Sequence, residues 1–301
     1  MAEKFIAGVA PETPLADAAR HVLELRLGAV AEWLPKALAG AHSETENVHQ
    51  LRVSTRRADA ALRIFRMCLP GRAFRTARGR LRSIRRAAGG ARDWDVFIQA
   101  MRERAGRKLA PVEKAGIDFL LAYALGQRHA AQGALDALAE ERPTPFAGLM
   151  AATVDEVRPS HAEGEESLGD IAGPALARLS SELAEAASRD LADYELLHRV
   201  RIAGKRLRYA MEVFGHCRDA AFREKLYPRV EEMQEILGRA NDSHVALGRL
   251  AAIRSGGAML GGAWARAEAG VEALARMHAR RLPQERRRFL KWWASWKEDG
   301  L

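Results

Sequence analysis

Residues 49–65 read HQLRVSTRRADAALRIF and residues 198–214 read HRVRIAGKRLRYAMEVF, so the chain carries two related copies of one motif. The copies align without an insertion at an offset of 149 residues, which places His49 on His198 and Phe65 on Phe214. The same offset pairs identical residues further along: Cys68 with Cys217, Gly89 with Gly238, Asp93 with Asp242, and Val96 with Val245. Self-similarity at a fixed period is typical of an internal repeat. The sequence therefore predicts a duplication into halves 14–156 and 174–297, joined by a linker at residues 157–173.

Each copy of the motif has the pattern of an amphipathic helix, with a narrow basic stripe on one side and apolar residues on the other. In the first copy the stripe holds His49, Arg52, Arg56 and Arg63, opposite Leu51, Ala58, Leu62 and Phe65. In the second copy the stripe holds His198, Arg201, Lys205 and Arg208, opposite Val200, Leu207, Met211 and Phe214. Like charges one turn apart repel each other. An extended polyanion lying along the stripe would relieve that repulsion.

A further basic helix is predicted directly after the first motif. Residues 72–88 place Arg75, Arg78, Arg82 and Arg86 on one side and Phe74, Leu81 and Ile84 on the other. Residues 49–92 contain thirteen Arg against a single acid, Asp59. Charged residues on a helix ordinarily form a solvated surface. Here, matched basic stripes in a region almost without acids favour an anion-binding site.

The composition bounds the class of protein. With 301 residues, of which 48% are hydrophobic, the chain can bury a substantial core. A net charge of +9 and a pI near 10.0 indicate acidic partners. Two Cys exclude a disulfide framework, and no apolar run reaches the ~18 residues of a membrane-spanning helix. We expect a soluble cytoplasmic protein.

No stretch alternates polar and apolar residues in the manner of a strand, so the chain is predicted to be all-α. The first half is expected to hold a helix at 14–39, the motif helix with Ser43 or Thr45 as its N-cap, and a helix at 72–88. Further helices are expected to begin at Arg92 and to span 111–127 and 128–140. The second half is expected to hold helices at 175–190, 195–215, 220–237 and 242–254, one ending near 278, and one opened by Pro283. Gly89 and Gly90 are expected to end a helix, so Asp93, like Asp242, is predicted to cap the next.

The two motifs with their downstream Gly and Asp resemble the CHAD family, the conserved histidine α-helical domain. The resemblance rests on His49-x-x-Arg52 and His198-x-x-Arg201, with Gly89-x-x-Arg92-Asp93 and Gly238-x-x-Asn241-Asp242, and it covers about residues 14–297. It implies two four-helix bundles related by a pseudo-twofold axis. It also implies binding of inorganic polyphosphate through basic helix faces. Because such binding needs no covalent step and no metal, we expect a non-catalytic protein without a cofactor, located in the cytoplasm on polyphosphate granules.

On that resemblance, and with the other members of the basic stripes, the polyphosphate site is expected to comprise fourteen residues. They are His49, Arg52, Arg56, Arg57, Arg63, Arg78, Arg82, His198, Arg201, Lys205, Arg206, Arg208, Lys225 and Arg229. Arginine suits this ligand because its planar fork binds phosphate oxygens in pairs. Asp59 is a departure, since the family often has a basic residue there; it is expected to weaken the first half or to pair with an Arg.

Two alternative functions stay open from the sequence. A helical, metal-dependent phosphohydrolase would use His and Asp, but no His-Asp dipeptide and no Walker A loop occur in the chain. A non-specific nucleic-acid-binding protein would explain the charge equally well. However, the only aromatic residues on the first two basic helices are Phe65 and Phe74, both predicted to face the core rather than to stack on bases.

The two motif histidines are ambiguous between a structural role and a ligand role, because a lone His near a helix start is more often structural. If a phosphate lies beside either one, it favours the charged imidazolium, whose unperturbed pKa is about 6.5. Tighter binding below neutral pH is then expected.

Overall fold

The computed structural model describes residues 4–39, 45–140, 146–158, 166–257, 259 and 261–299. Within these residues the only β feature is an isolated bridge between Pro14 and Ser167, so the predicted all-α class is confirmed. The α-helices are α1 (Leu15–Ala39), α2 (Thr45–Ile64), α3 (Gly71–Ala105), α4 (Pro111–Glu140), α5 (Phe146–Asp155), α6 (Leu168–Ala187), α7 (Tyr194–Val213), α8 (Tyr227–Gly257) and α9 (Gly262–Asp299). Short 3₁₀ turns, η1 (Arg66–Cys68) and η2 (Gly215–Cys217), end the motif helices, and a π-helical turn, η3 (Phe222–Leu226), precedes α8.

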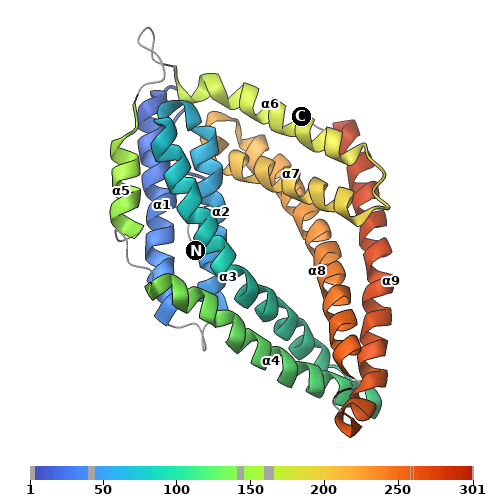
Figure 1. The fold of residues 1–301 in the computed structure, drawn as a ribbon. Coiled ribbons are helices and arrows are strands. Elements are labelled where there is room, and N and C mark those ends of the chain that lie inside the picture. Colours follow the sequence, from blue (N-terminus) through green and yellow to red (C-terminus); the bar gives the residue numbers. More distant parts are fainter. Residues whose placement is uncertain are drawn as a thin grey trace.

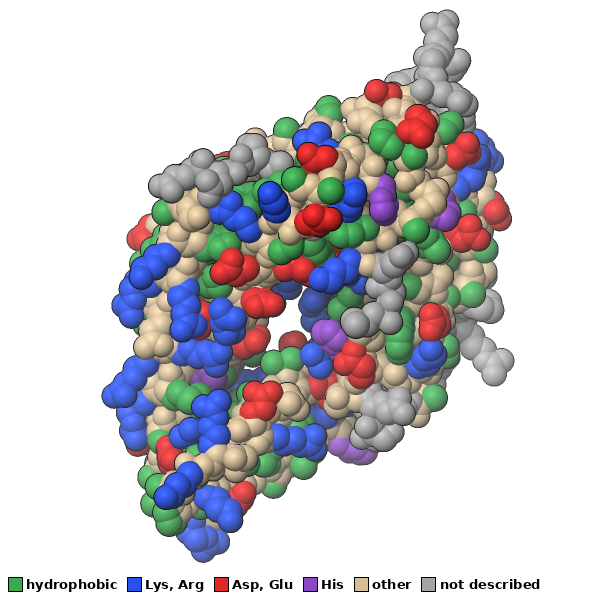
Figure 2. Space-filling view, turned by 180° about the vertical axis from the view of Figure 1, so that it is seen from behind, with side chains coloured by type: hydrophobic (Ala, Val, Ile, Leu, Met, Phe, Trp, Pro, Cys, Tyr) green, Lys and Arg blue, Asp and Glu red, His purple; other side chains and the backbone are tan. Residues whose placement is uncertain are grey.

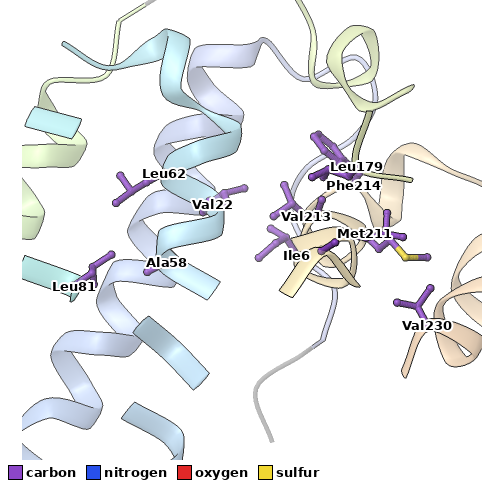
Figure 3. Packing of buried hydrophobic residues seen from close by; sticks show 14 of the residues in the cluster. Ile6, Val22, Ala58, Leu62, Leu81, Leu179, Met211, Val213, Phe214 and Val230 are labelled. Atoms are coloured by element: carbon purple, nitrogen blue, oxygen red, sulfur yellow. The ribbon is translucent and has the colours of Figure 1, made fainter. Parts of the chain in front are cut away.

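The motif helices α2 and α7 bury the faces that the sequence predicts. Leu51, Ala58, Leu62 and Phe65 are fully buried, and so are Val200, Leu207 and Met211. Leu62 and Ala58 pack toward Val22 of α1 and Leu81 of α3, whereas Met211 and Phe214 pack near Leu179 and Val230 (Figure 3). Burying the apolar side of each helix fixes its rotation, so most of the basic stripe lies on the opposite side of the helix.

Three of the predicted helix breaks are wrong, because α3, α4 and α8 each run unbroken through the position expected to interrupt them. Gly89 and Gly90 lie inside α3, and a Cβ on Gly89 would come within 3.2 Å of Arg52 Nη1. A glycine inside a helix costs about 1 kcal/mol relative to alanine, and here it leaves room for an arginine of the neighbouring helix. Asp93 and Asp242 therefore lie inside helices and cap neither α3 nor α8.

The expected break at Pro283 is also wrong, since α9 continues through it. An internal proline removes one helical hydrogen bond and costs about 3 kcal/mol. Beyond the proline, α9 buries four aromatic residues against the main core: Phe289, Trp292, Trp293 and Trp296. Burying a large apolar side chain stabilises by about 1.5–3 kcal/mol each, which outweighs the cost of the proline.

The predicted linker is partly helical. Helix α6 begins at Leu168, where the Ser167 side chain accepts a hydrogen bond from the Asp170 backbone N–H and the Asp170 carboxylate accepts one from the Ser167 backbone N–H. This capping box satisfies the amides that an N-terminus leaves unpaired, so residues 168–173 join the helix rather than a linker. Helix α5 was not expected from the sequence. Ser43, a predicted cap, and residues 159–165 lie outside the described residues, while Thr45 is the first residue of α2.

The hydrophobic core consists of two clusters, and each takes residues from both halves of the chain. The larger cluster joins α1, α2, α5, α6 and α7 to the nearer ends of α3, α8 and α9. The smaller cluster takes three residues from each of α3, α4, α8 and α9: Phe97, Ile98, Met101, Ile117, Leu120, Ala124, Ala246, Leu250, Ile253, Trp264, Val271 and Leu274. Figure 1 shows these four long helices converging at the end of the molecule that lies far from α1 and α6. The two clusters hold α2, α3, α7 and α8 around a central hollow, which is open in Figure 2.

Candidate anion-binding cleft

A cleft of about 640 Å³ lies between α2, α3, α7 and α8. Its charged lining is dominated by cations, with eight Arg and Lys side chains against three Asp. The charged and histidine residues are His49, Arg52, Arg56, Asp59, Arg63, Arg85, Arg92, Asp93, His198, Arg201, Lys205, Arg206 and Asp242. Because α2 contacts α7 directly, the basic stripes of both motifs border one space.

Burial and mutual repulsion depress the pKa values of the cations in this cleft. Burial, together with the charges of Arg201 and Arg56, lowers the pKa of Lys205 to about 6. Burial also lowers the pKa of Arg52 to about 10, helped by Arg56. Arg56 belongs to α2 and Lys205 to α7, so the repulsion acts across the seam between the motif helices. A bound anion would reverse it.

Most of these cations lack a carboxylate partner. Among the described residues, no carboxylate lies within ion-pair distance of Arg56, Arg85, Arg92, Arg201 or Lys205. Arg52 has only a distant partner, with Nη2 3.9 Å from Asp93 Oδ1, and its Nη1 donates to the Arg85 carbonyl at 2.9 Å. The Nε atoms of Arg52 and Arg201 are buried without a hydrogen-bond partner in the described chain. Buried donors left unpaired cost about 1–3 kcal/mol each, so these groups favour a ligand with oxygen acceptors.

Both motif histidines line the cleft. Burial lowers the pKa of His49, and Arg92 lowers it further, while burial and then Arg201 lower the pKa of His198. Asn241 acts on the pKa of His198 in the opposite direction, and its Oδ1 accepts a hydrogen bond from the Tyr194 hydroxyl at 2.9 Å. Both shifts favour the neutral imidazole in the free protein, and an anion nearby would favour its protonation.

Two of the predicted residues, Arg57 and Arg208, point to a buried carboxylate instead of the cleft. Glu212 is fully buried, and Arg57 Nε lies 2.7 Å from its Oε2 while Arg208 Nη1 lies 3.1 Å from its Oε1. Arg26 of α1 lies 3.5 Å away, and the Tyr227 hydroxyl donates to Glu212 at 3.0 Å. We call these five residues the Glu212 cluster. The five side chains contact one another, and because they come from four helices they hold α1, α2, α7 and α8 together.

The other predicted residues divide between the cleft and other surfaces. Asp59 accepts from Arg78 Nε at 2.7 Å and from Arg63 Nε at 3.1 Å, so the expectation that Asp59 pairs with an arginine is confirmed. Arg63 lines the cleft, whereas Arg78 and the exposed Arg82 do not. Lys225 and Arg229 line a separate hollow beside η3, and Arg206 lies at the cleft with a contact of 3.4 Å to Glu182.

Sequence reasoning missed Arg85, Arg92, Asn241 and Tyr209, which all line the cleft. Arg85 and Arg92 are seven residues apart and so share one side of a continuous helix. The predicted break at Gly89 separated them and hid the pattern. If α3 had been predicted as one continuous helix, Arg85 and Arg92 would have been recognised as cations on the same side of it.

Residues 21–251 match the CHAD domain family. The chain belongs to this family. The crystal structure of the CHAD domain from the plant Ricinus communis is similar, with a TM-score of 0.70 and 24% identity over 91% of this chain and 89% of that one. PptA from Streptomyces chartreusis is similar with a TM-score of 0.62 and 20% identity, over 94% of this chain and all of that one. These structural likenesses support the fold, and no curated protein matches the chain in sequence.

None of the helices in the described residues is long and apolar enough to cross a membrane. No group of three or more His, Cys, Asp or Glu side chains among these residues is placed to hold a metal ion.

Proposed function

We propose that this CHAD protein binds inorganic polyphosphate in the cleft between α2, α3, α7 and α8, without catalysis. The observation that carries the proposal is the set of half-buried cations without a close carboxylate partner on both motif helices, above all Arg52, Arg201 and Lys205. The Nε atoms of Arg52 and Arg201 are buried without a hydrogen-bond partner among the described residues. Burying cations without a carboxylate is costly, and a polymer of phosphates supplies the missing acceptors repeatedly along its length.

The cleft suits phosphate better than nucleic acid. Apart from the histidines, Tyr209 is the only aromatic side chain among the described residues that line the cleft; it is 6% exposed and has Arg208 over its ring. Proteins that bind single strands usually stack bases on exposed aromatic rings. A chain of phosphates needs no such platform.

We also infer that α2 and α7 are duplicated elements with matched roles, related by a pseudo-twofold axis. The pairs that the 149-residue offset relates have similar surroundings: the Nε atoms of Arg52 and Arg201 are both buried and unpaired, and His49 and His198 both line the cleft. Two matched stripes on one space offer a ligand a continuous path across both halves.

The test is a binding titration with long-chain polyphosphate, duplex DNA and single-stranded DNA at physiological salt. We expect polyphosphate to bind at least about 10-fold more tightly than either DNA, because the cleft lacks a base platform. Equal affinity with the same salt dependence would contradict the assignment. In cells, a fluorescent fusion is expected to sit on polyphosphate granules in the cytoplasm.

The absence of catalysis has its own test. Incubation with polyphosphate and Mg²⁺ or Mn²⁺ is expected to release no phosphate above background, and a chelator is expected to leave binding intact. Metal-dependent turnover that is lost in Asp93→Asn or Asp242→Asn would instead support a phosphohydrolase.

A further inference from the structure

The second half of α9 carries an exposed row of cations that the proposed function does not use. We call it the α9 edge: Arg276, Arg280, Arg281, Arg287, Arg288 and Lys291. Between residues 273 and 291 the only acid is Glu285, whose side chain is 2% exposed. Figure 2 shows Lys and Arg side chains gathered along the α9 side of the molecule. The charged side chains that this stretch exposes are therefore all cationic.

The cations of the α9 edge are only partly neutralised. Glu285 is shared by Arg239 of α8, at 3.0 Å, and by Arg288 and Arg281 of the edge, at 2.7 and 3.8 Å. Arg276 lies 3.5 Å from Glu272. Arg280, Arg287 and Lys291 are exposed and have no ion-pair partner among the described residues. Their spacing, four and seven residues, places them along one side of the helix. They present a line of unpaired positive charge to the solvent.

The α9 edge adjoins the cleft through α8. Arg281 lines a surface hollow of about 450 Å³ on α9, and its charge also stabilises the ionised form of Asp242. Asp242 lines the cleft and feels the charge of Arg201 as well. The contact of Arg239 with Glu285 fixes α9 against α8 at this place. Asp242 therefore lies between Arg201 of the cleft and Arg281 of the α9 edge, within the electrostatic reach of both.

We propose that a polyphosphate chain filling the cleft continues past Asp242 along the α9 edge, so that the protein selects chains long enough to occupy both. This inference rests on the proposed function of the cleft. Trp292, Trp293 and Trp296 of the same helix are buried, so the edge offers cations without exposed rings for bases. That chemistry fits a phosphate polymer better than a single-stranded nucleic acid.

The experiment compares two double variants with the wild-type protein, using tripolyphosphate and long-chain polyphosphate as ligands. Arg280→Ala/Arg287→Ala removes two unpaired cations of the edge. Arg102→Ala/Lys108→Ala removes two exposed cations without described ion-pair partners near the end of α3, and so matches the change in net charge. Both pairs are exposed, so neither substitution disturbs the core.

We expect the edge variant to bind long chains roughly 3- to 10-fold more weakly, with a salt slope lower by about 0.7–0.9 per lost contact. Its affinity for tripolyphosphate, which the cleft alone accommodates, is expected to stay at the wild-type value. The α3 control is expected to change neither affinity. Unchanged long-chain affinity and salt slope in the edge variant overturn the inference, and so does an equal loss for both ligands.

Two comparisons separate this inference from the function of the cleft. If wild-type protein binds neither phosphate ligand, the proposed function itself fails. If Arg201→Ala weakens both ligands while the edge variant changes neither, only the extension along α9 fails. Duplex DNA serves as a third ligand: loss of DNA binding in the edge variant, with polyphosphate binding intact, assigns the edge to nucleic acid and overturns the inference.

Discussion

The cleft and the Glu212 cluster place cations of the same two helices in opposite situations. Arg208 and Lys205 are three residues apart on α7. Burial acts to lower the pKa of Arg208, but Glu212 outweighs it and raises that pKa, whereas burial and neighbouring cations lower the pKa of Lys205 to about 6. A buried cation with a carboxylate holds the fold together. A buried cation without a carboxylate partner lowers the stability of the fold, and its charge is available to a ligand.

The largest expected effect is on the Glu212 cluster. Glu212→Gln leaves Arg26, Arg57 and Arg208 without a counter-charge in the core, so the free energy of unfolding is expected to fall by about 3–5 kcal/mol. Urea unfolding followed by circular dichroism measures it. The matched control is Glu182→Gln, whose side chain is 34% exposed and pairs with Arg178. It is expected to change stability by less than about 1 kcal/mol. Similar losses in both variants would contradict a structural role specific to Glu212.

Substitutions in the cleft are expected to lower the affinity for polyphosphate instead of the stability of the protein. Arg52→Ala/Arg56→Ala and Arg201→Ala/Lys205→Ala are each expected to weaken binding of long polyphosphate at least about 10-fold, because each removes charge-assisted hydrogen bonds. The helix content measured by circular dichroism is expected to stay unchanged. Each lost phosphate contact is expected to lower the salt slope by about 0.7–0.9. If one double variant abolishes binding and the other leaves affinity and salt slope untouched, the ligand path is confined to one motif.

Lys205 is expected to make the stability of the protein depend on pH, which tests the comparison between the cleft and the Glu212 cluster. Its pKa in the folded protein is lowered to about 6, so between about pH 6 and 10.5 the unfolded chain binds more protons, and stability rises with pH through this range. Lys205→Met is expected to stabilise the protein by at least about 1 kcal/mol at pH 7, with a gain that shrinks toward pH 10. Thermal unfolding at several pH values checks this, and a constant gain across the range would contradict it.

The same residue links binding to protons. An anion in the cleft raises the pKa of Lys205, so binding takes up a proton near pH 7–8 and the affinity for polyphosphate falls as pH rises from 6 to 8. Calorimetric titrations in buffers of different ionisation enthalpy measure the uptake. It is expected to decrease in Lys205→Met, leaving the contribution of His49 and His198. Equal uptake in wild type and variant would exclude Lys205 as the linked group.

The smallest expected effect belongs to Asp59, the acid that pairs with Arg63 and Arg78 at the rim of the cleft. Asp59→Asn removes a negative charge beside the ligand path and releases Arg63, so affinity for polyphosphate is expected to rise about 2- to 5-fold. Stability is expected to fall, because Arg78 loses its partner. A lower affinity at full helix content would show that Asp59 orients the arginines for binding rather than competing for them.

The all-α class and the orientation of both motif helices were predictable from the sequence. Apolar residues recur with the helical period within each motif, so Leu51 and Leu62 had to face a core and Arg52 had to face away from it. The same periodicity brought His49, Arg56, Arg201 and Lys205 onto the right sides of their helices. These features depend on neighbours within a few turns, which a single sequence displays.

Only the tertiary structure decided which cations are paired and where the helices end. Arg57 and Glu212 are 155 residues apart, and nothing in either motif indicates that they meet. The breaks predicted at Gly89 and Pro283 failed because packing against distant helices outweighs the local cost of glycine or proline. Arg85 and Arg92 join the cleft for the same reason, since they share a face only on an unbroken α3. Local periodicity fixes the face that a residue occupies, whereas the partner on that face depends on contacts between segments far apart in the chain.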